Sequence, residues 1–158
     1  MANIKYTETN QVDIDAIKPL WEKLNEHIRV RSPYFKRHYE TFTFDRRKAE
    51  LLRKADKGLM HICLASDIDT GKIIGYCIST IIKEVDETEG EIDSIFVDSS
   101  YRSAGIGDSL MKKALAWMDA LGTSKKRISV GVGNESVFTF YERYGFYPRM
   151  TMLQQIKK

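Results

Sequence analysis

The segment from residue 95 to residue 110 constrains the fold of this chain more than any other. The apolar run at residues 95–97 predicts a strand, and Gly105 and Gly107 precede an amphipathic helix. A turn of this kind directs several backbone N–H groups to one point and adds the positive end of the helix dipole. Glycine also lets a phosphate approach the backbone closely. The segment therefore predicts a pyrophosphate-sized anion site at a strand-to-helix junction.

Two well-known phosphate loops do not fit these residues. The Walker loop ends in Gly-Lys-Ser/Thr, whereas Gly107 is followed by Asp and Ser. The dinucleotide fingerprint needs a small residue where Leu110 stands and a carboxylate at the end of the next strand, and residues 129–133 contain none. What remains is Arg-x-x-Gly-x-Gly, in which Arg102 adds a fixed positive charge.

Apolar periodicity and turn residues predict the order βααβββαβαβ, an α/β domain with a mixed, mostly antiparallel sheet. The expected strands cover residues 4–7, 61–65, 73–82, 91–97, 127–132 and 147–156, and the expected helices 13–28, 44–56, 105–121 and 135–144. Residues 30–43 read as a loop with at most one helical turn. Pro19 either begins the first helix late or kinks it.

Length and composition limit the remaining choices. A chain of 158 residues with 42% hydrophobic and 30% charged residues is typical of one globular domain. No apolar run reaches the ~18 residues of a membrane helix, and the first residues do not form a signal peptide. Two cysteines and three scattered histidines match no zinc site, and a net charge of +3 does not imply nucleic acid. We expect a cytoplasmic protein without a metal, a membrane partner or a nucleic-acid partner.

The glycine segment resembles the acyl-CoA pyrophosphate loop of the GNAT superfamily of N-acyltransferases. The second signature of that family is an Asn, then a helix ending in Phe-Tyr, then Gly-Phe. It is matched here by Asn134, by Phe140 with Tyr141, and by the Gly-Phe pair at 145–146, although Val137 stands where Ala is commoner. The resemblance covers about residues 60–147.

The resemblance implies one GNAT-like domain over residues 1–158. Its sheet would have six to seven strands, flanked by about four helices and splayed at the strands before and after the main helix. Residues 1–59 would form variable acceptor-side helices, residues 60–147 the acetyl-CoA-binding core, and residues 148–158 the final strand.

The resemblance also assigns the binding residues. Backbone groups of 95–97 would pair with the pantetheine arm of acetyl-CoA, the co-substrate, and one N–H would polarise the thioester carbonyl. The implied cofactor-binding residues are Ile95, Phe96, Val97, Arg102, Ser103, Ala104, Gly105, Ile106, Gly107, Asp108, Ser109, Asn134, Phe140 and Tyr141.

The implied reaction is direct attack of a primary amine, from a small molecule or a protein, on the acetyl thioester. Tyr141 matches the family's general acid, because a phenol of pKa about 10 can protonate a thiolate of pKa about 8.5. It can also be an ordinary core aromatic. Asp93 and Glu91 share one face of their strand and are candidate bases, directly or through water. Equally, both belong to an acidic run of the kind that is usually a solvated turn.

Two charge patterns give opposite indications about the acceptor. The acidic run over residues 84–93 favours a cationic amine. Residues 29–57, with ten Lys/Arg against four Asp/Glu, favour an acidic one or form the charged outer face of a helix. Both readings stay open.

Two other functions are compatible with these residues. One alternative is a non-catalytic acyl-CoA sensor on the same fold. Another is a nucleic-acid module that uses the basic segment with Tyr34, Phe35 and Tyr39.

Cys63 and Cys77 are expected to face each other across a hairpin, either as a redox pair or as reduced core residues. The final strand, near residues 150–156, would be a place for a homodimer to pair.

Overall fold

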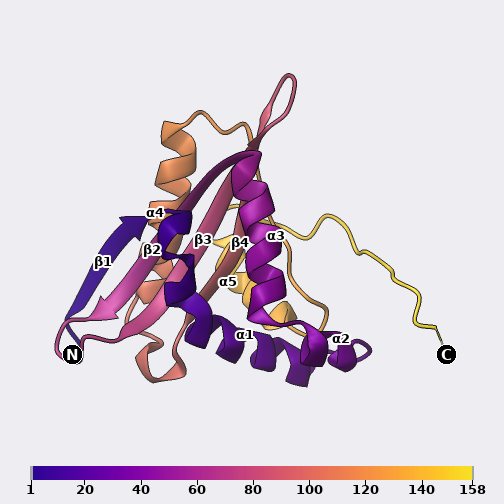
Figure 1. Cartoon of the computed structure of the whole chain (residues 1–158), viewed down its shortest axis with the longest axis horizontal. Coiled ribbons are helices and arrows are strands. Elements are labelled where there is room, and N and C mark those ends of the chain that lie inside the picture. Colours follow the sequence, from indigo (N-terminus) through magenta and orange to yellow (C-terminus); the bar gives the residue numbers. More distant parts are fainter. Residues whose placement is uncertain (1, 158) are drawn as a thin grey trace.

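A single five-stranded sheet organises the chain, in the order β1-β2-β3-β4-β5 (Figure 1). The computed structural model describes residues 2–157, so residues 1 and 158 of the predicted domain lie outside it. The strands are β1 Ile4–Thr9, β2 Gly58–Asp67, β3 Ile73–Lys83, β4 Thr88–Val97 and β5 Lys125–Ile128. The helices are α1 Lys18–Arg31, α2 Lys36–Thr41, α3 Phe44–Asp56, α4 Ile106–Ala120 and α5 Phe138–Glu142, with short 3-10 helices at Gln11–Ile17, Ser99–Tyr101 and Glu135–Val137.

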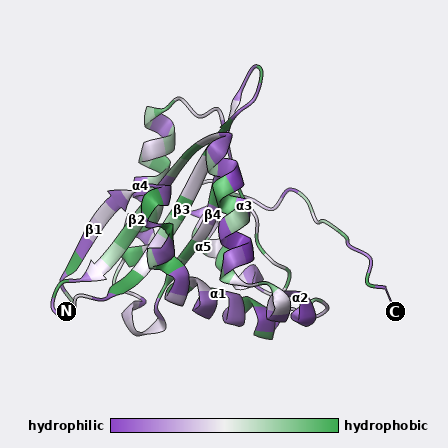
Figure 2. Cartoon of the chain, viewed as in Figure 1, coloured by the Kyte–Doolittle hydropathy of each residue, from purple (hydrophilic) through white to green (hydrophobic). Residues whose placement is uncertain are grey.

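The sheet is covered on both faces, so the molecule has three layers. One apolar cluster packs α1 and α3 against β2 and β3, with Trp21, Leu51 and Tyr76 at its centre. The second cluster packs α4 and α5 against the opposite face, around Leu110 and Met111. Apolar residues accordingly concentrate along the central strands (Figure 2). Burial on both faces explains why β2 and β3 read as nearly continuous apolar runs.

The pairing of β4 and β5 opens the sheet at one end. Strands β1 to β4 are antiparallel, whereas β5 runs parallel to β4 and pairs with it only from Glu89 to Ile92. β4 continues to Val97 and β5 ends at Ile128, so the two strands separate beyond Ile92. This is the predicted splay, and it leaves one backbone edge of residues 93–97 without a neighbouring strand.

A β-bulge in β4 decides which way two acidic side chains point. Ile78 pairs with Ser94 while Ser79 pairs with Ile92, so Asp93 is the extra residue. An inserted residue reverses the alternation of side chains on its two sides. Glu91 and Asp93 therefore face α3, whereas Ile95 packs in the α4 cluster.

The structure corrects several predicted elements. Residues 2–157 form five strands and five α-helices, not six to seven strands and about four helices. The expected final strand over 147–156 is wrong: residues 147–157 are exposed and unpaired, and extend away from the body (Figure 1). A strand needs a neighbour to bond, and apolar alternation alone does not supply one. The predicted loop at 30–43 contains α2, and Pro19 lies in the first turn of α1, which begins late.

Two predictions about the hairpin are confirmed. The hairpin between β2 and β3 turns at Gly71, which has a φ of 72°. Cys63 pairs with Cys77 in register across that hairpin. Within residues 2–157, no helix is both long enough and apolar enough to cross a membrane.

Candidate active site

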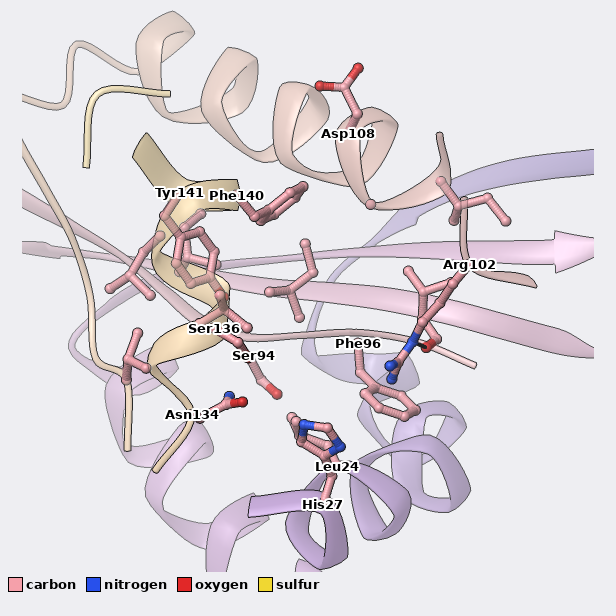
Figure 3. Close-up of a pocket in the computed structure, with 18 of the residues that line it drawn as sticks. Leu24, His27, Ser94, Phe96, Arg102, Asp108, Asn134, Ser136, Phe140 and Tyr141 are labelled. Carbon is pink, nitrogen blue, oxygen red and sulfur yellow. Dashed lines mark hydrogen bonds between the residues drawn. The ribbon is translucent and has the colours of Figure 1, made fainter. Parts of the chain in front are cut away.

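A cavity of about 650 Å³ lies where β4 and β5 separate. It is enclosed by α1 on one side and by α5 with the start of α4 on the other (Figure 3). Of the residues predicted from the sequence, those lining it are 93, 95–97, 102, 103, 105–108, 134, 140 and 141. Ala104, Ser109 and Glu91 do not line it.

The glycine turn forms one end of the cavity. Gly105 caps α4 in the left-handed conformation, with a φ of 75°, and Ser103 shares this conformation with a φ of 70°. The first backbone N–H groups of a helix have no partner within the helix, so those of Ile106 to Asp108 can bind an anion at this end. Gly105 thus has the conformation that favours glycine, and the close approach of a phosphate at Gly107 stays a prediction.

Two charged side chains complete this end. Arg102 donates from Nε to the carbonyl of Val97 at 3.2 Å, and its guanidinium lies 5.4 Å from the centre of the Phe96 ring. It is thereby held at the cavity as a fixed positive charge. Asp108 points away from the cavity (Figure 3), where it is bonded by Tyr144 and by Lys112 Nζ at 2.9 Å. Its carboxylate therefore does not compete for the anion site.

Tyr141 on α5 is at once a core residue and a cavity residue. Its ring packs in the α4 cluster and meets Phe140 edge-on at 5.4 Å, and it also lines the cavity. Burial, with a smaller contribution from the Cys77 thiol, raises the pKa of Tyr141 to about 12. The phenol is therefore fully protonated at neutral pH. Tyr141 is thus a core aromatic that reaches the cavity, and its role as general acid stays a prediction.

The predicted bases lie in a charged network with α3. Lys54 Nζ bonds Asp93 and also Glu91, the latter at 2.7 Å, and Thr80 Oγ1 donates to Asp93 at 2.7 Å. Arg47 donates to the backbone oxygen of Asp93 at 2.9 Å. The Asp93 side chain is only 1% exposed. This network ties the bulge of β4 to a helix that is close to forty residues away in sequence.

The two carboxylates differ in their pKa. Burial raises the pKa of Asp93, although Lys54 and Thr80 oppose it. Burial also acts to raise the pKa of Glu91, but Lys54 and Arg127 outweigh it, so its pKa is lowered. Asp93 is thus the better proton acceptor of the two, and it is the one that lines the cavity.

Sequence reasoning missed His27, which faces the cavity from α1 opposite Tyr141 (Figure 3). Burial, together with the guanidinium groups of Arg31 and Arg102, lowers its pKa below 6.5 and favours the neutral imidazole. The available signal was its position three residues after Leu24, inside the apolar stripe of the helix.

The structure also tests whether these residues fit an acyl-CoA. Asn134 is buried, and its Oδ1 finds no hydrogen-bond partner within residues 2–157. A buried amide oxygen without a partner is costly, so this atom suits an amide N–H of a bound pantetheine arm. Together with the free edge of β4 and the α4 N-terminus, Asn134 makes the cavity fit that group. Among residues 2–157, no group of three or more His, Cys, Asp or Glu is placed to hold a metal ion.

Comparison with known proteins agrees with this geometry. The family model described as "Acetyltransferase (GNAT) family" matches residues 21–146. An uncharacterized N-acetyltransferase of Methanocaldococcus jannaschii is 31% identical over 123 residues, which are 72% of this chain and 53% of that protein. The chain thus spans about half the length of this curated relative.

Two solved structures show the same fold. A putative acetyl transferase from Pyrococcus furiosus is 25% identical with a TM-score of 0.70, covering 97% of this chain and 100% of that one. The glucosamine-6-phosphate N-acetyltransferase of Arabidopsis thaliana is 19% identical with a TM-score of 0.64, covering 99% of both chains. The family match, with a glycine turn at a helix N-terminus, a splayed sheet and a cavity between them, shows that this chain belongs to the GNAT acetyltransferase family.

Proposed function

We propose that this chain is an N-acetyltransferase that moves an acetyl group from acetyl-CoA to a primary amine by direct attack. One observation carries the proposal: a single cavity joins the anion-binding turn, the free edge of β4 and the Tyr141 phenol. An acyl-CoA has a pyrophosphate, an amide-bearing arm and a thioester in that order. The cavity offers a matching group for each.

Binding would use mainly backbone groups. The N-terminal N–H groups of α4 and Arg102 would hold the pyrophosphate. The arm would add to the free edge of residues 95–97 like an extra strand, with Asn134 accepting one of its N–H groups. An N–H of β4 would then point at the thioester carbonyl and stabilise the negative charge that develops there.

The chemistry forms a C–N bond and breaks the C–S bond. The neutral amine attacks the carbonyl carbon, and the thiolate departs. Tyr141 would donate its proton toward the departing sulfur. Its raised pKa does not prevent this, because a thiolate in the same dry cavity also holds a proton more tightly than it does in water.

The proton of the attacking nitrogen needs an acceptor, and two groups of the cavity qualify. Asp93 has a raised pKa, but Lys54 and Thr80 occupy its oxygens, so it would act through water. His27 is neutral and faces the cavity directly. Glu91, which does not line the cavity, is the weakest of the predicted bases.

The acceptor is proposed only as a primary amine of a small molecule or a protein. Both charge patterns of the sequence are largely neutralised by ion pairs: Lys54 pairs with Glu91 and Asp93, while Glu87 and Glu89 pair with Lys125 and Arg127. Neither pattern therefore supports a charge preference.

The test is thiol release from acetyl-CoA with a mixed panel of amines. We expect amine-dependent release that falls about 100-fold in kcat in Tyr141→Phe. Tyr147→Phe, which removes a hydroxyl from an exposed ring, is the matched control and should keep full activity. Release that is unchanged in Tyr141→Phe would refute its role as acid. Tight acetyl-CoA binding without release for any amine would favour the sensor instead.

A further inference from the structure

A buried pair of hydroxyl groups connects the apolar core to the wall of the cavity. Tyr76 on β3 is 0% exposed, and its phenol oxygen lies 2.7 Å from Oγ of Ser94 on β4. Ser94 lines the cavity, whereas Tyr76 does not. Ser94 directly follows the bulge residue Asp93 in β4. The reaction described above uses neither hydroxyl.

The direction of this hydrogen bond follows from the burial of Tyr76. Burial raises the pKa of Tyr76 against smaller opposing effects of Ser94 and Arg47, so the phenol keeps its hydrogen. Within residues 2–157 that hydrogen has one acceptor, Ser94 Oγ, and a buried donor without an acceptor is costly. Tyr76 therefore donates to Ser94. The Ser94 oxygen gives one lone pair to this bond, and its second lone pair and its own hydrogen remain for the cavity.

Ser94 and His27 face each other across one part of the cavity. Figure 3 shows the Ser94 hydroxyl pointing toward the His27 ring and away from Tyr141. His27 is favoured as the neutral imidazole, in which one ring nitrogen has a free lone pair. The α1 residues beside His27 that line the cavity, Leu24 and Ile28, are apolar and offer no competing hydrogen bond. Two hydrogen-bond acceptors thus lie on the side away from the proposed general acid.

These two acceptors match the hydrogens of a neutral primary amine. Such an amine has two N–H groups and one lone pair. With one N–H bonded to Ser94 and the other to His27, the lone pair is free to attack the thioester carbon. As the C–N bond forms and the C–S bond breaks, His27 takes one proton and the departing sulfur takes the proton of Tyr141. The second N–H stays on the amide product, still bonded to Ser94.

A secondary amine does not match this arrangement. It has a single N–H, which is the one lost in the reaction, and its second alkyl group would face the Ser94 oxygen. That oxygen would then lose a hydrogen-bond partner on binding, which costs free energy.

We propose that Ser94 binds the attacking nitrogen and selects primary amines, and that Tyr76 is a positioning residue that fixes the Ser94 hydroxyl. The inference rests on the proposed N-acetyltransferase function and extends it to recognition of the acceptor. Because Tyr76 occupies one lone pair of Ser94, the second lone pair stays directed at the cavity. Tyr76 contacts no reactant, so its effect on the rate passes through Ser94.

Steady-state kinetics with an active primary amine and its N-methyl derivative test the role of Ser94. In Ser94→Ala, kcat/KM for the primary amine should fall about 10-fold, as expected for one lost hydrogen bond, while the KM for acetyl-CoA is unchanged. The preference for the primary amine over its N-methyl derivative should fall as well. Ser79→Ala removes a buried hydroxyl on β3 that does not line the cavity, and it should change neither value. An unchanged preference in Ser94→Ala overturns the proposal.

A double-variant cycle tests the positioning role of Tyr76. Tyr76→Phe removes a hydroxyl without changing a residue that lines the cavity, so its effect does not come from added room. The kcat/KM for the primary amine should fall about threefold, because the Ser94 hydroxyl is then free to rotate. Tyr76→Phe/Ser94→Ala should be no slower than Ser94→Ala alone. Effects that multiply would show that Tyr76 acts independently of Ser94, and would refute its positioning role.

Failure of this inference is distinguishable from failure of the proposed function. If the wild type releases no thiol from acetyl-CoA with any amine, the proposed function is wrong and the role of Ser94 is refuted with it. If the wild type is active and Ser94→Ala acts on the primary amine equally fast, only the role of Ser94 is refuted. Amide hydrogen exchange in β2 and β3 should be equally slow in every variant, which shows that each is folded.

Discussion

The two sides of the cavity are built in different ways. Most of the proposed cofactor side comes from one continuous segment, residues 95–108, and the binding groups proposed there are mainly backbone N–H groups and Arg102. The opposite side is assembled from α1 and the bulge of β4, and Asp93 of that bulge is held by Lys54 of α3, so its polar groups meet only through tertiary contacts. A site made of backbone can be recognised in a local sequence motif. A site made of distant side chains depends on packing.

The largest expected effect concerns the α3 network. Lys54→Met should destabilise the fold by about 3–5 kcal/mol, because it leaves the buried Asp93 carboxylate without its cation. Urea unfolding measures this. If the stability of this region depends on the pairing of Lys54 with Asp93, the double variant Lys54→Met/Asp93→Asn should recover much of the lost free energy of unfolding.

The matched control for that change is Lys48→Met on the same helix. Lys48 pairs with Asp15, whose side chain is 73% exposed, so the loss should be less than about 1 kcal/mol. Equal losses of unfolding free energy in Lys48→Met and Lys54→Met would show that the burial of Asp93 does not make its ion pair more important for stability than the exposed pair.

Arg102→Ala tests the cofactor side. The KM for acetyl-CoA should rise about 10- to 100-fold with little change in kcat, because a charge-assisted contact to the pyrophosphate is lost from ground state and transition state alike. Lys112→Ala removes the same charge from the second turn of α4, at a side chain 70% exposed, and should have little effect. A comparable rise in Lys112→Ala would mean that general positive potential, not Arg102, binds the co-substrate.

His27 lies where the two sides meet, and its titration should be visible in stability. Its pKa is below 6.5 in the folded protein, so the folded state binds the proton less tightly than the unfolded chain. The stability that depends on neutral His27 is fully present above pH 6.5, and it is lost as the pH falls through the pKa of His27 in the folded protein. His27→Gln should abolish this acid-side loss of stability, measured by urea unfolding at pH 7.5 and 5. An identical loss in His27→Gln would assign the acid sensitivity to other groups.

The smallest effect is expected in the central strands between the two faces. Burial raises the pKa of Cys63 to about 11 and that of Cys77 to about 12. Both thiols stay protonated at pH 8, so iodoacetamide should label neither in the folded protein and both in urea. Activity should be unchanged by mild oxidation. Rapid labelling of the folded protein would reveal opening of the β2–β3 hairpin and revive the redox interpretation.

Local signals predicted much of this molecule. The α4 stripe, the helix α3 and the hairpin at Gly71 were all expected from periodicity and turn residues, and they formed close to their expected bounds. The hairpin register expected from the sequence also predicted that Cys63 and Cys77 face each other, as they do. The helix predicted over residues 135–144 is an α-helix only at Phe138–Glu142, after a 3-10 turn at Glu135–Val137. The ends of so short a helix depend on tertiary contacts that the sequence does not show.

The amino-acid sequence by itself determined the glycine turn, the amphipathic helix after it and the family signature, because these depend on backbone conformation and on neighbours within a few residues. Tertiary structure alone decided that a bulge turns Asp93 toward Lys54 and that His27 enters the cavity. It also decided that residues 147–157 find no partner strand among the described residues 2–157. The physical reason is that an ion pair, a cavity wall and a strand each need a second element, and the position of that element is a property of the whole fold.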